Sequence, residues 1–396
     1  MKLKDSHSML VNAVSPPTTP IARDQPLRIV IVSDAVAGRN GLGTYYLDLI
    51  EHLRDRVGHI SLIGPTSDRH SELEGMSLPM PGDKTQRMVC PRVAALNRML
   101  DERNPNLVII PTIGAFSYFG LRYASSRQIP MVIAHHTNFD QLLSLYWPGL
   151  VAKPLGWMLR QLNEWLIGQA SMVASLNTEA YEDAVALGAQ QARIMGTPIA
   201  TSFLRVPPAP RNDSIRRVIF VGRLAAEKGV EEVLDSAKKY PQIEFAIAGD
   251  GPGREVVEAA ASTLRNVRYL GWLSRDRVRE ELDRSEVLML PSAIETFGTV
   301  ALEALARERY VLLRSECGIA KWPSLASGLF YIDEEDSVAD SLGKLLAKPV
   351  EARDQIARRS WDAVHDFNQH TIRVWLEFLA EAVDRHDAPG LERQAA

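Results

Sequence analysis

The chain has few of the features that mark membrane-embedded, disulfide-rich or nucleic-acid-binding proteins. Only two of its 396 residues are cysteines, Cys90 and Cys317, and they form no spacing typical of a metal or redox site. We therefore expect reduced, buried thiols in a cytoplasmic protein. No uncharged apolar run reaches the roughly 18 residues that cross a bilayer. A net charge of only −4 argues against a general nucleic-acid binder.

The remaining composition is that of an ordinary globular protein, with 46% apolar and 24% charged residues. This length exceeds what one hydrophobic core usually organises, which favours two domains. Residues 1–26 contain Pro, Ser and Thr but no long apolar run, and this predicts a disordered leader. Residues 1–207 carry 19 basic and 17 acidic side chains, whereas the rest carry 26 and 32, so the first half is better suited to an anionic surface.

Short apolar runs alternate with helical patterns throughout both halves, as in parallel sheets that are covered on both faces. In the first half, strands are predicted at 27–34, 59–64, 106–112, 131–137 and 171–177, with helices around 43–56, 92–104 and 148–169. After the proline-rich segment 206–214, strands are predicted at 216–223, 243–251, 267–273, 286–292 and 310–315. The pattern predicts an α/β protein with two doubly wound, Rossmann-like domains that face a cleft.

The predicted domain boundaries follow from this alternation. The first domain would cover residues 27–207 and the second residues 208–365. A final helical stretch, 353–384, contains four large aromatic side chains and is longer than a covering helix needs to be. We therefore expect residues 366–396 to cross back toward the first domain and to end in a tail.

Two cations follow the first strand of the predicted second domain. Arg223 leaves this strand, and Lys228 comes five residues later, just before Gly229 and a helix. Two positive charges beside a helix N-terminus suit a diphosphate, because the charges and the helix dipole act in the same direction. A solvated arginine and a helix-flanking lysine would explain the same residues. Gly251, after the next strand, would allow close approach of the backbone to a ligand, although a tight turn alone also explains it.

The segment PSAIETFGTVALEALA (291–306) places Glu295 in a turn and Glu303 within a helix, eight positions apart. The backbone amides at the start of this predicted helix, which a helix leaves unpaired, belong to Thr296, Phe297, Gly298 and Thr299. An anion on these amides would lie between the two carboxylates, which accept hydrogen bonds from hydroxyl groups. A nucleotide sugar has this layout. The alternative is that Glu295 caps the helix and Glu303 is exposed.

Together, the motifs G-R-x(4)-K-G, G-D-G-P and E-x-F-G-x(4)-E resemble those of the retaining GT-B glycosyltransferases of family 4, and the resemblance extends from about residue 27 over nearly the whole chain. It implies that Arg223 and Lys228 hold the donor diphosphate. It also implies that Glu295 meets the hydroxyls of the donor sugar and that Glu303 binds the ribose diol.

The first half resembles the same family. NGLGTYYLDL (40–49) is similar to its glycine loop, in which Gly41 would let the backbone approach the diphosphate. HHTNFD (135–140) places His136 and Thr137 at the family's histidine position, where His136 would orient the sugar and the acceptor. His135 fits this position less well.

One loop departs from the family pattern. Where the family commonly has G-G-[IV]-P-E, this chain reads ECGIAKWPSLASGLFY (316–331) and keeps only Gly318 and Ile319. The resemblance therefore does not extend to donor-sugar contacts from this loop.

The resemblance implies transfer of a hexose from UDP-hexose or GDP-mannose to a hydroxyl group, with retention of the anomeric configuration. Arg223, Lys228 and the helix start would stabilise the departing diphosphate by fixed electrostatics. No metal site and no cofactor would then be required, and the nucleotide sugar would be a substrate.

The acceptor is suggested by residues 136–168, which are rich in Leu and Trp and resemble the corresponding segment of family members that glycosylate membrane lipids. Trp147, Trp157 and Trp165 would lie at the headgroup level, and Lys153 and Arg160 would face anionic lipid. This predicts a lipid acceptor such as diacylglycerol or a phosphatidylinositol-type lipid, and a peripheral protein on the inner face of the plasma membrane.

Other interpretations remain open at the level of sequence. If residues 136–168 are instead buried against their own sheet, a soluble sugar or small metabolite is the better acceptor. A non-catalytic nucleotide-sugar-binding or dinucleotide-binding protein is a more distant alternative, and GRNGLGTY (38–45) matches the dinucleotide motif only loosely. These patterns do not specify an oligomeric state.

Overall fold

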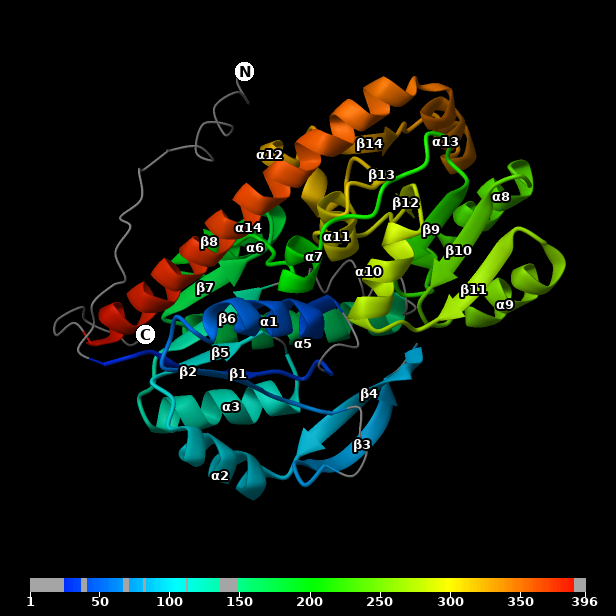
Figure 1. Cartoon of the computed structure of the whole chain (residues 1–396). Helices are drawn as coiled ribbons and strands as arrows, with labels where there is room; N and C mark the ends of the chain where they lie inside the picture. The colour runs from blue at the N-terminus through cyan, green and yellow to red at the C-terminus, as the bar shows by residue number, and fades with distance from the viewer. Residues whose placement is uncertain are drawn as a thin grey trace, which may run out of the picture.

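The computed structural model describes residues 25–36, 41–66, 71–80, 83–111, 113–135 and 149–387 (Figure 1). They form two α/β domains, each built on a six-stranded sheet with parallel pairing between all neighbouring strands. The predicted fold class is therefore confirmed.

The first sheet has the strand order β2-β1-β5-β6-β7-β8. Its strands are β1 (Arg28–Val32), β2 (His59–Ile63), β5 (Leu107–Ile110), β6 (Met131–His135), β7 (Met172–Ser175) and β8 (Ala192–Ile194). The helices around it are α1 (Gly41–Leu53), α2 (Val93–Arg103), α3 (Ala115–Ser126), α5 (Gly149–Gly168) and α6 (Thr178–Ala186). Ile29 and Ile31 of β1 belong to one buried cluster, whereas Val30 and Val32 belong to another. Both faces of the sheet are therefore covered, which explains its nearly continuous apolar strands.

The second sheet has the order β11-β10-β9-β12-β13-β14. Its strands are β9 (Arg217–Val221), β10 (Glu244–Ala248), β11 (Val267–Gly271), β12 (Val287–Leu290), β13 (Tyr310–Arg314) and β14 (Leu329–Ile332). Its helices are α8 (Val230–Lys239), α9 (Arg254–Thr263), α10 (Arg275–Asp283), α11 (Thr299–Ala306), α12 (Pro323–Ala326) and α13 (Val338–Ala347), with 3₁₀ turns η1 (Ala226–Lys228) and η2 (Gly318–Lys321). Here too the buried side chains of β9 alternate between two clusters.

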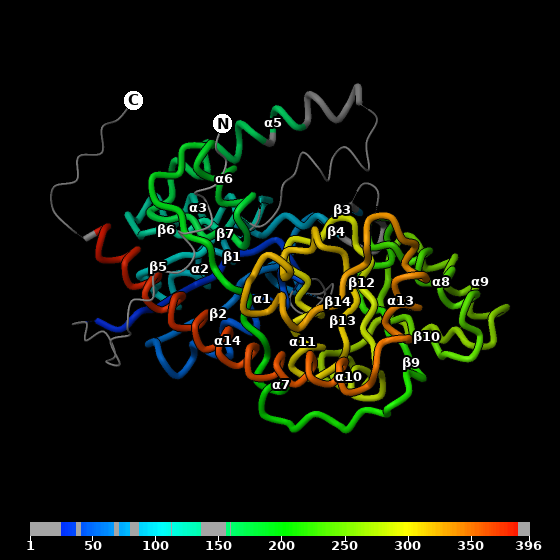
Figure 2. Tube along the Cα trace, turned by 90° about the horizontal axis from the view of Figure 1, so that it is seen from above, coloured from blue at the N-terminus to red at the C-terminus, as the bar shows by residue number. Residues whose placement is uncertain are grey.

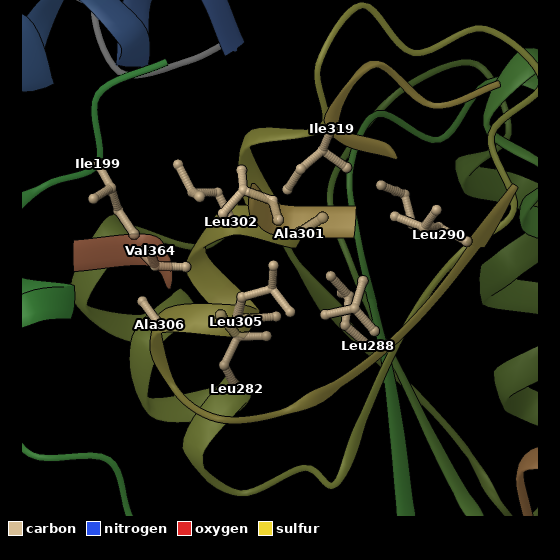
Figure 3. Close-up of a cluster of buried hydrophobic side chains, with 14 of the residues drawn as sticks. Ile199, Leu282, Leu288, Leu290, Ala301, Leu302, Leu305, Ala306, Ile319 and Val364 are labelled. Carbon is tan, nitrogen blue, oxygen red and sulfur yellow. The ribbon is translucent and has the colours of Figure 1, made fainter. Parts of the chain in front are cut away.

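The chain crosses between the two cores twice. In the first crossing, Met195 packs in the core of the first domain, whereas Ile199 packs in that of the second, beside Leu302 and Val364 (Figure 3). The second crossing is α14 (Val350–Asp387), which runs along both domains in Figure 1. Its Phe367 lies in the second core and its Ile372 in the first.

The two crossings touch each other. A Cβ atom on Gly196 would lie 2.0 Å from Oγ1 of Thr371 in α14, and the backbone amide of Ile199 donates to Oδ1 of Asn368 at 3.1 Å. The two covalent connections between the domains therefore lie side by side.

Buried arginines hold the segment that follows the first crossing, which includes α7 (Thr201–Arg205). Arg307 donates to the carbonyl oxygens of Phe203 at 3.1 Å and Pro207 at 2.7 Å. Arg309 donates to the carbonyl oxygen of Ala209. The linker is thus fixed to the second domain.

Several features differ from the sequence-based expectations. The antiparallel hairpin of β3 (Glu74–Met80) and β4 (Asp83–Pro91) was not predicted. The strands β8 and β14 were also not predicted, and neither were the helices α3 and α6. Cys90 is exposed rather than buried, and only Cys317 is the buried thiol that was expected. In the part of the chain that the structure describes, no helix is long and apolar enough to cross a membrane.

Candidate active site

Lys228 and Glu295 meet at the carboxyl end of the second sheet. Lys228 ends the 3₁₀ turn η1 after β9, and Glu295 lies in the loop between β12 and α11. The Nζ atom of Lys228 is 2.7 Å from Oε2 of Glu295 and also donates to the carbonyl oxygen of Ile294 at 3.1 Å. β9 and β12 are neighbours in the sheet, so their carboxyl ends bring these two loops together.

Arg223 lies in the same loop as Lys228 and forms an ion pair with Glu227. The backbone of this loop is held by the glycine loop after β10: the amide of Leu224 donates to the carbonyl oxygen of Asp250 at 3.0 Å. Gly251 has a φ of +151°, and a Cβ atom there would lie 2.6 Å from the carbonyl oxygen of Leu224. Close packing of two loops therefore requires this glycine, whether or not a ligand approaches it.

The loop that carries Glu295 is held by the atypical segment after β13. The amide of Gly318 donates to the carbonyl oxygen of Glu295 at 3.0 Å, and that of Ile319 donates to Phe297 at 2.8 Å. A Cβ atom on Gly318 would lie 1.8 Å from the carbonyl oxygen of Thr296. The two residues that this segment shares with the family pattern therefore position the glutamate loop through their backbone.

Gly298 is the N-cap of α11, with a φ of +90°, so Glu295 does not cap this helix. A Cβ atom on Gly298 would lie 3.0 Å from Sγ of Cys317, and its backbone conformation disfavours other residues. Within the described ranges, no acceptor is found for the backbone amides of Thr296, Phe297, Gly298 and Thr299. These amides and the cationic Lys228 together form a surface suited to an anion.

Glu303 is buried, with 5% of its surface exposed, which excludes the alternative of an exposed side chain. Its Oε1 atom lies 3.2 Å from Nη2 of Arg275, the first residue of α10. The same Nη2 atom lies 2.9 Å from Oδ2 of Asp48 on α1 of the first domain. Burial raises the pKa of Glu303. Burial also raises the pKa of Asp48 to about 7. The nearby carboxylate of Glu303 raises this pKa further, whereas the positive charge of Arg275 lowers it.

The first domain contacts the second at a further place, the loop that carries Glu295. Asn177, the N-cap of α6, donates from Nδ2 to the carbonyl oxygen of Thr296 at 3.2 Å. Glu179 of the same helix pairs with Lys321 of η2. At the end of β6, His135 is buried, and its Nε2 atom lies 2.7 Å from Oδ2 of Asp183 on α6. The domains therefore meet at the carboxyl ends of both sheets, where ligands of this kind of fold bind.

Several predicted residues lie outside the described residues, namely His136, Thr137 and Trp147. The side chain of Lys153 on α5 is likewise outside what the structure describes. Gly41 begins α1, and the space around it within the described part of the chain is open.

From residue 156 onward, α5 has two different faces. Leu166 and Ile167 are buried in a core of the first domain. Trp157 is 67% exposed and Met158 is 51% exposed, and Arg160 is also exposed. Figure 2 shows α5 on the opposite side of the first domain from α14. The helix is therefore anchored to its sheet and also presents aromatic and apolar side chains to solvent.

No cluster of His, Cys, Asp or Glu that could hold a metal ion occurs among the described residues. Four residues of the site were not predicted from sequence: Asp48, Asn177, Glu227 and Arg275. Glu227 stands beside Lys228 in the motif and could have been included. The other three are brought to the site by tertiary contacts between residues more than 25 positions apart.

Two family models match the two halves of the chain. Residues 39–201 match the family described as Glycosyltransferase Family 4, and residues 207–360 match Glycosyl transferases group 1. The two halves of the chain are the two domains of a GT-B glycosyltransferase. This assignment agrees with the fold and with the motif resemblance found in the sequence.

Curated relatives of these glycosyltransferase domains have different stated activities. The sulfoquinovosyl transferase SQD2 of Arabidopsis thaliana is 25% identical over 51% of this chain and 41% of its own length. The phosphatidylinositol N-acetylglucosaminyltransferase gpi3 subunit of Schizosaccharomyces pombe is 28% identical over 37% and 34%. The 2-deoxystreptamine N-acetyl-D-glucosaminyltransferase of Streptomyces fradiae is 29% identical over 51% and 45%. The chain thus spans less than half the length of these relatives.

Solved structures support the GT-B fold over nearly the whole chain. Sucrose-phosphate synthase from Thermosynechococcus elongatus has a TM-score of 0.68 and 17% identity, with coverage of 91% of this chain and 99% of the other. HepE of Anabaena, in complex with UDP-glucose, has a TM-score of 0.62 and 15% identity, with coverage of 90% and 99%.

Proposed function

We propose that this chain is a retaining glycosyltransferase that moves a hexose from UDP-hexose or GDP-mannose to a hydroxyl group of a membrane lipid, such as diacylglycerol or a phosphatidylinositol-type lipid. The observation that carries the proposal is the 2.7 Å contact between Lys228 and Glu295 beside the amides that begin α11, for which the described residues provide no acceptor. In this proposal the second domain, residues 208–365, binds the nucleotide sugar, and the first domain, residues 27–207, binds the acceptor.

The chemistry follows from the charges at this site. During transfer, negative charge develops on the leaving diphosphate and positive charge on the sugar ring. Lys228 has three donor hydrogens, so it can hold Glu295 and a phosphate oxygen together. Arg223 and the amides from Thr296 onward would add fixed donors that need no reorganisation as the charge develops. The chain supplies this stabilisation from its own residues.

The carboxylates would orient the neutral parts of the donor. Glu295 is held by Lys228, which leaves further acceptor positions on its two oxygens for sugar hydroxyls. Glu303 would accept from the ribose diol. His136 would orient the donor sugar and the acceptor from the first domain, with Thr137 next to it, and Gly41 would allow approach to the diphosphate.

A lipid acceptor is supported by the exposed Trp157 and Met158 on α5 and by the cationic Arg160 next to them. Aromatic side chains of this kind favour the headgroup region of a bilayer, and an arginine adds attraction to anionic lipid. The name of the gpi3 subunit, which includes phosphatidylinositol, points the same way. The protein would then act as a peripheral protein on the inner face of the plasma membrane, with Trp147 and Lys153 in the same contact.

A soluble acceptor is the second candidate. It is favoured by the anchored face of α5, where Leu166 and Ile167 are buried, and by the 2-deoxystreptamine named for the Streptomyces fradiae relative.

The test is to incubate the protein with UDP-glucose, UDP-galactose or GDP-mannose and to measure nucleotide release with and without lipid extract. We expect one donor to give release that lipid accelerates, with a glycolipid product of the donor's anomeric configuration. Acceleration by a soluble acceptor but not by lipid would support the second candidate. Absence of transfer from every donor to either acceptor class would contradict the proposed function.

A further inference from the structure

Arg275 occupies a junction of four elements from both domains. It begins α10, pairs with Glu303 of α11 at 3.2 Å and with Asp48 of α1 at 2.9 Å, and places its guanidinium 5.4 Å from the ring centre of Phe203 in α7. Phe203 is fully buried. One side chain therefore connects the first domain, the linker helix and the predicted ribose end of the donor site.

The position of Arg275 is unfavourable for its own helix. A positive charge in the first turn of a helix opposes the helix dipole. The compensation comes from outside α10, because both carboxylates belong to other elements and both are buried. Without Arg275, Asp48 and Glu303 would be two buried acidic groups at a domain boundary with no opposite charge between them, and such an arrangement is strongly disfavoured.

We propose that Arg275 is a positioning residue that couples donor binding to the contact between the two domains. Asp48 shares the Nη2 atom of Arg275 with Glu303, so that Glu303 keeps acceptor capacity for the ribose diol. When Asp48 is removed, Arg275 pairs with Glu303 alone and competes with the diol. The boundary between the domains also loses the ion pair between Asp48 and Arg275. This proposal rests on the proposed function, because it assigns the ribose to Glu303.

Through this coupling, Asp48 of the first domain affects the affinity of the second domain for the nucleotide. Asp48→Asn keeps the shape of the side chain but removes its charge. We expect this variant to bind UDP or GDP at least about fivefold more weakly, which is the lower end of typical coupling between sites. The KM for the donor should rise while kcat at saturating donor changes by less than about twofold, because ground state and transition state share this contact.

A double-mutant cycle separates coupling from a general loss of structure. Asp48→Asn and Glu303→Gln should give effects on UDP or GDP affinity that are clearly less than additive, because both act through Arg275. Arg275→Lys, which keeps the charge, should recover part of the affinity that Arg275→Gln loses. The matched control is Glu179→Gln, which breaks an ion pair across the same boundary without touching Glu303. Its effect should stay below about twofold.

Small-angle X-ray scattering, measured without nucleotide, tests whether Arg275 holds the two domains together. Arg275→Gln should increase the radius of gyration of the full chain, whereas Glu179→Gln should not. If Asp48→Asn behaves like Glu179→Gln in affinity, or if the cycle is additive, the coupling is overturned while the proposed function stands. If the unmodified protein binds neither UDP nor GDP, the proposed function fails and the coupling fails with it, whatever the scattering shows.

Discussion

Lys228 and Glu295 form an ion pair of 2.7 Å between the ends of two neighbouring strands. Sequence motifs assign these residues to different parts of a nucleotide sugar, the lysine to the diphosphate and the glutamate to the sugar. Their pairing means that each fixes the other before a donor arrives. A preorganised pair of this kind lowers the cost of orienting charges during transfer.

Lys228→Ala should lower the turnover number by about a hundredfold or more, because it removes a charge beside the developing diphosphate and releases Glu295. Arg223→Ala should act in the same direction. Turnover at saturating donor is the measurement, with circular dichroism to check folding. Lys238→Ala, on the exposed face of α8, is the control and should retain normal turnover. A folded Lys228→Ala protein with near-normal turnover would refute the diphosphate assignment.

Gly318→Ala should damage the site without touching any predicted ligand contact. The added methyl group would lie 1.8 Å from the carbonyl oxygen of Thr296, so the loop that carries Glu295 must move. We expect turnover to fall by about tenfold or more, because small displacements of catalytic groups have large effects. Gly168→Ala, at the open end of α5, is the matched control. Equal turnover in the two variants would show that close packing of Gly318 on the loop of Glu295 is not needed for transfer.

The pH dependence of stability should carry a contribution from Asp48. Burial raises its pKa from 3.8 to about 7, so between these values the folded state binds more protons than the unfolded state. The free energy of unfolding from this group is therefore greatest below pH 4, falls as the pH rises through about 7, and then levels off. Glu303 acts in the same direction.

Asp48→Asn removes this contribution, so the Tm of the variant relative to the unmodified protein should increase between pH 5 and pH 7.5. Thermal unfolding at several pH values is the measurement. Asp101→Asn, which alters an exposed ion pair, should change the Tm little at any of these values. A Tm difference for Asp48→Asn that is constant with pH would contradict the raised pKa.

Trp157→Ser combined with Arg160→Gln should reduce sedimentation with liposomes that contain phosphatidylglycerol. Loss of the arginine alone corresponds to about 1 kcal/mol of attraction at low salt. Since Trp157 is exposed, the fold and slow donor hydrolysis should be preserved. Trp272→Ser, an exposed tryptophan of the second domain, should bind liposomes normally. Unchanged sedimentation and lipid glycosylation by the double variant would favour a soluble acceptor.

The sequence predicted the parallel sheets because strands buried on both faces are nearly continuous runs of apolar residues, as in β1 and β12. The β3–β4 hairpin escaped prediction because β4 begins with a run of five polar residues and because β3 contains Pro79, which is unusual within a strand. At the candidate site, motif spacing predicted roles for Lys228, Glu295 and Glu303. Asp48 and Arg275 could not be found in this way, because they lie 227 positions apart and are paired only by the meeting of two domains.

The two crossings meet at Gly196 and Thr371, which gives the molecule a single pivot point. All covalent connection between the lobes passes through this one place, and Arg307 and Arg309 keep the linker beyond it attached to the second lobe. Any rotation of one lobe relative to the other would therefore pivot at this place, and the displacement would be largest at the ends of the lobes that lie farthest from Gly196 and Thr371.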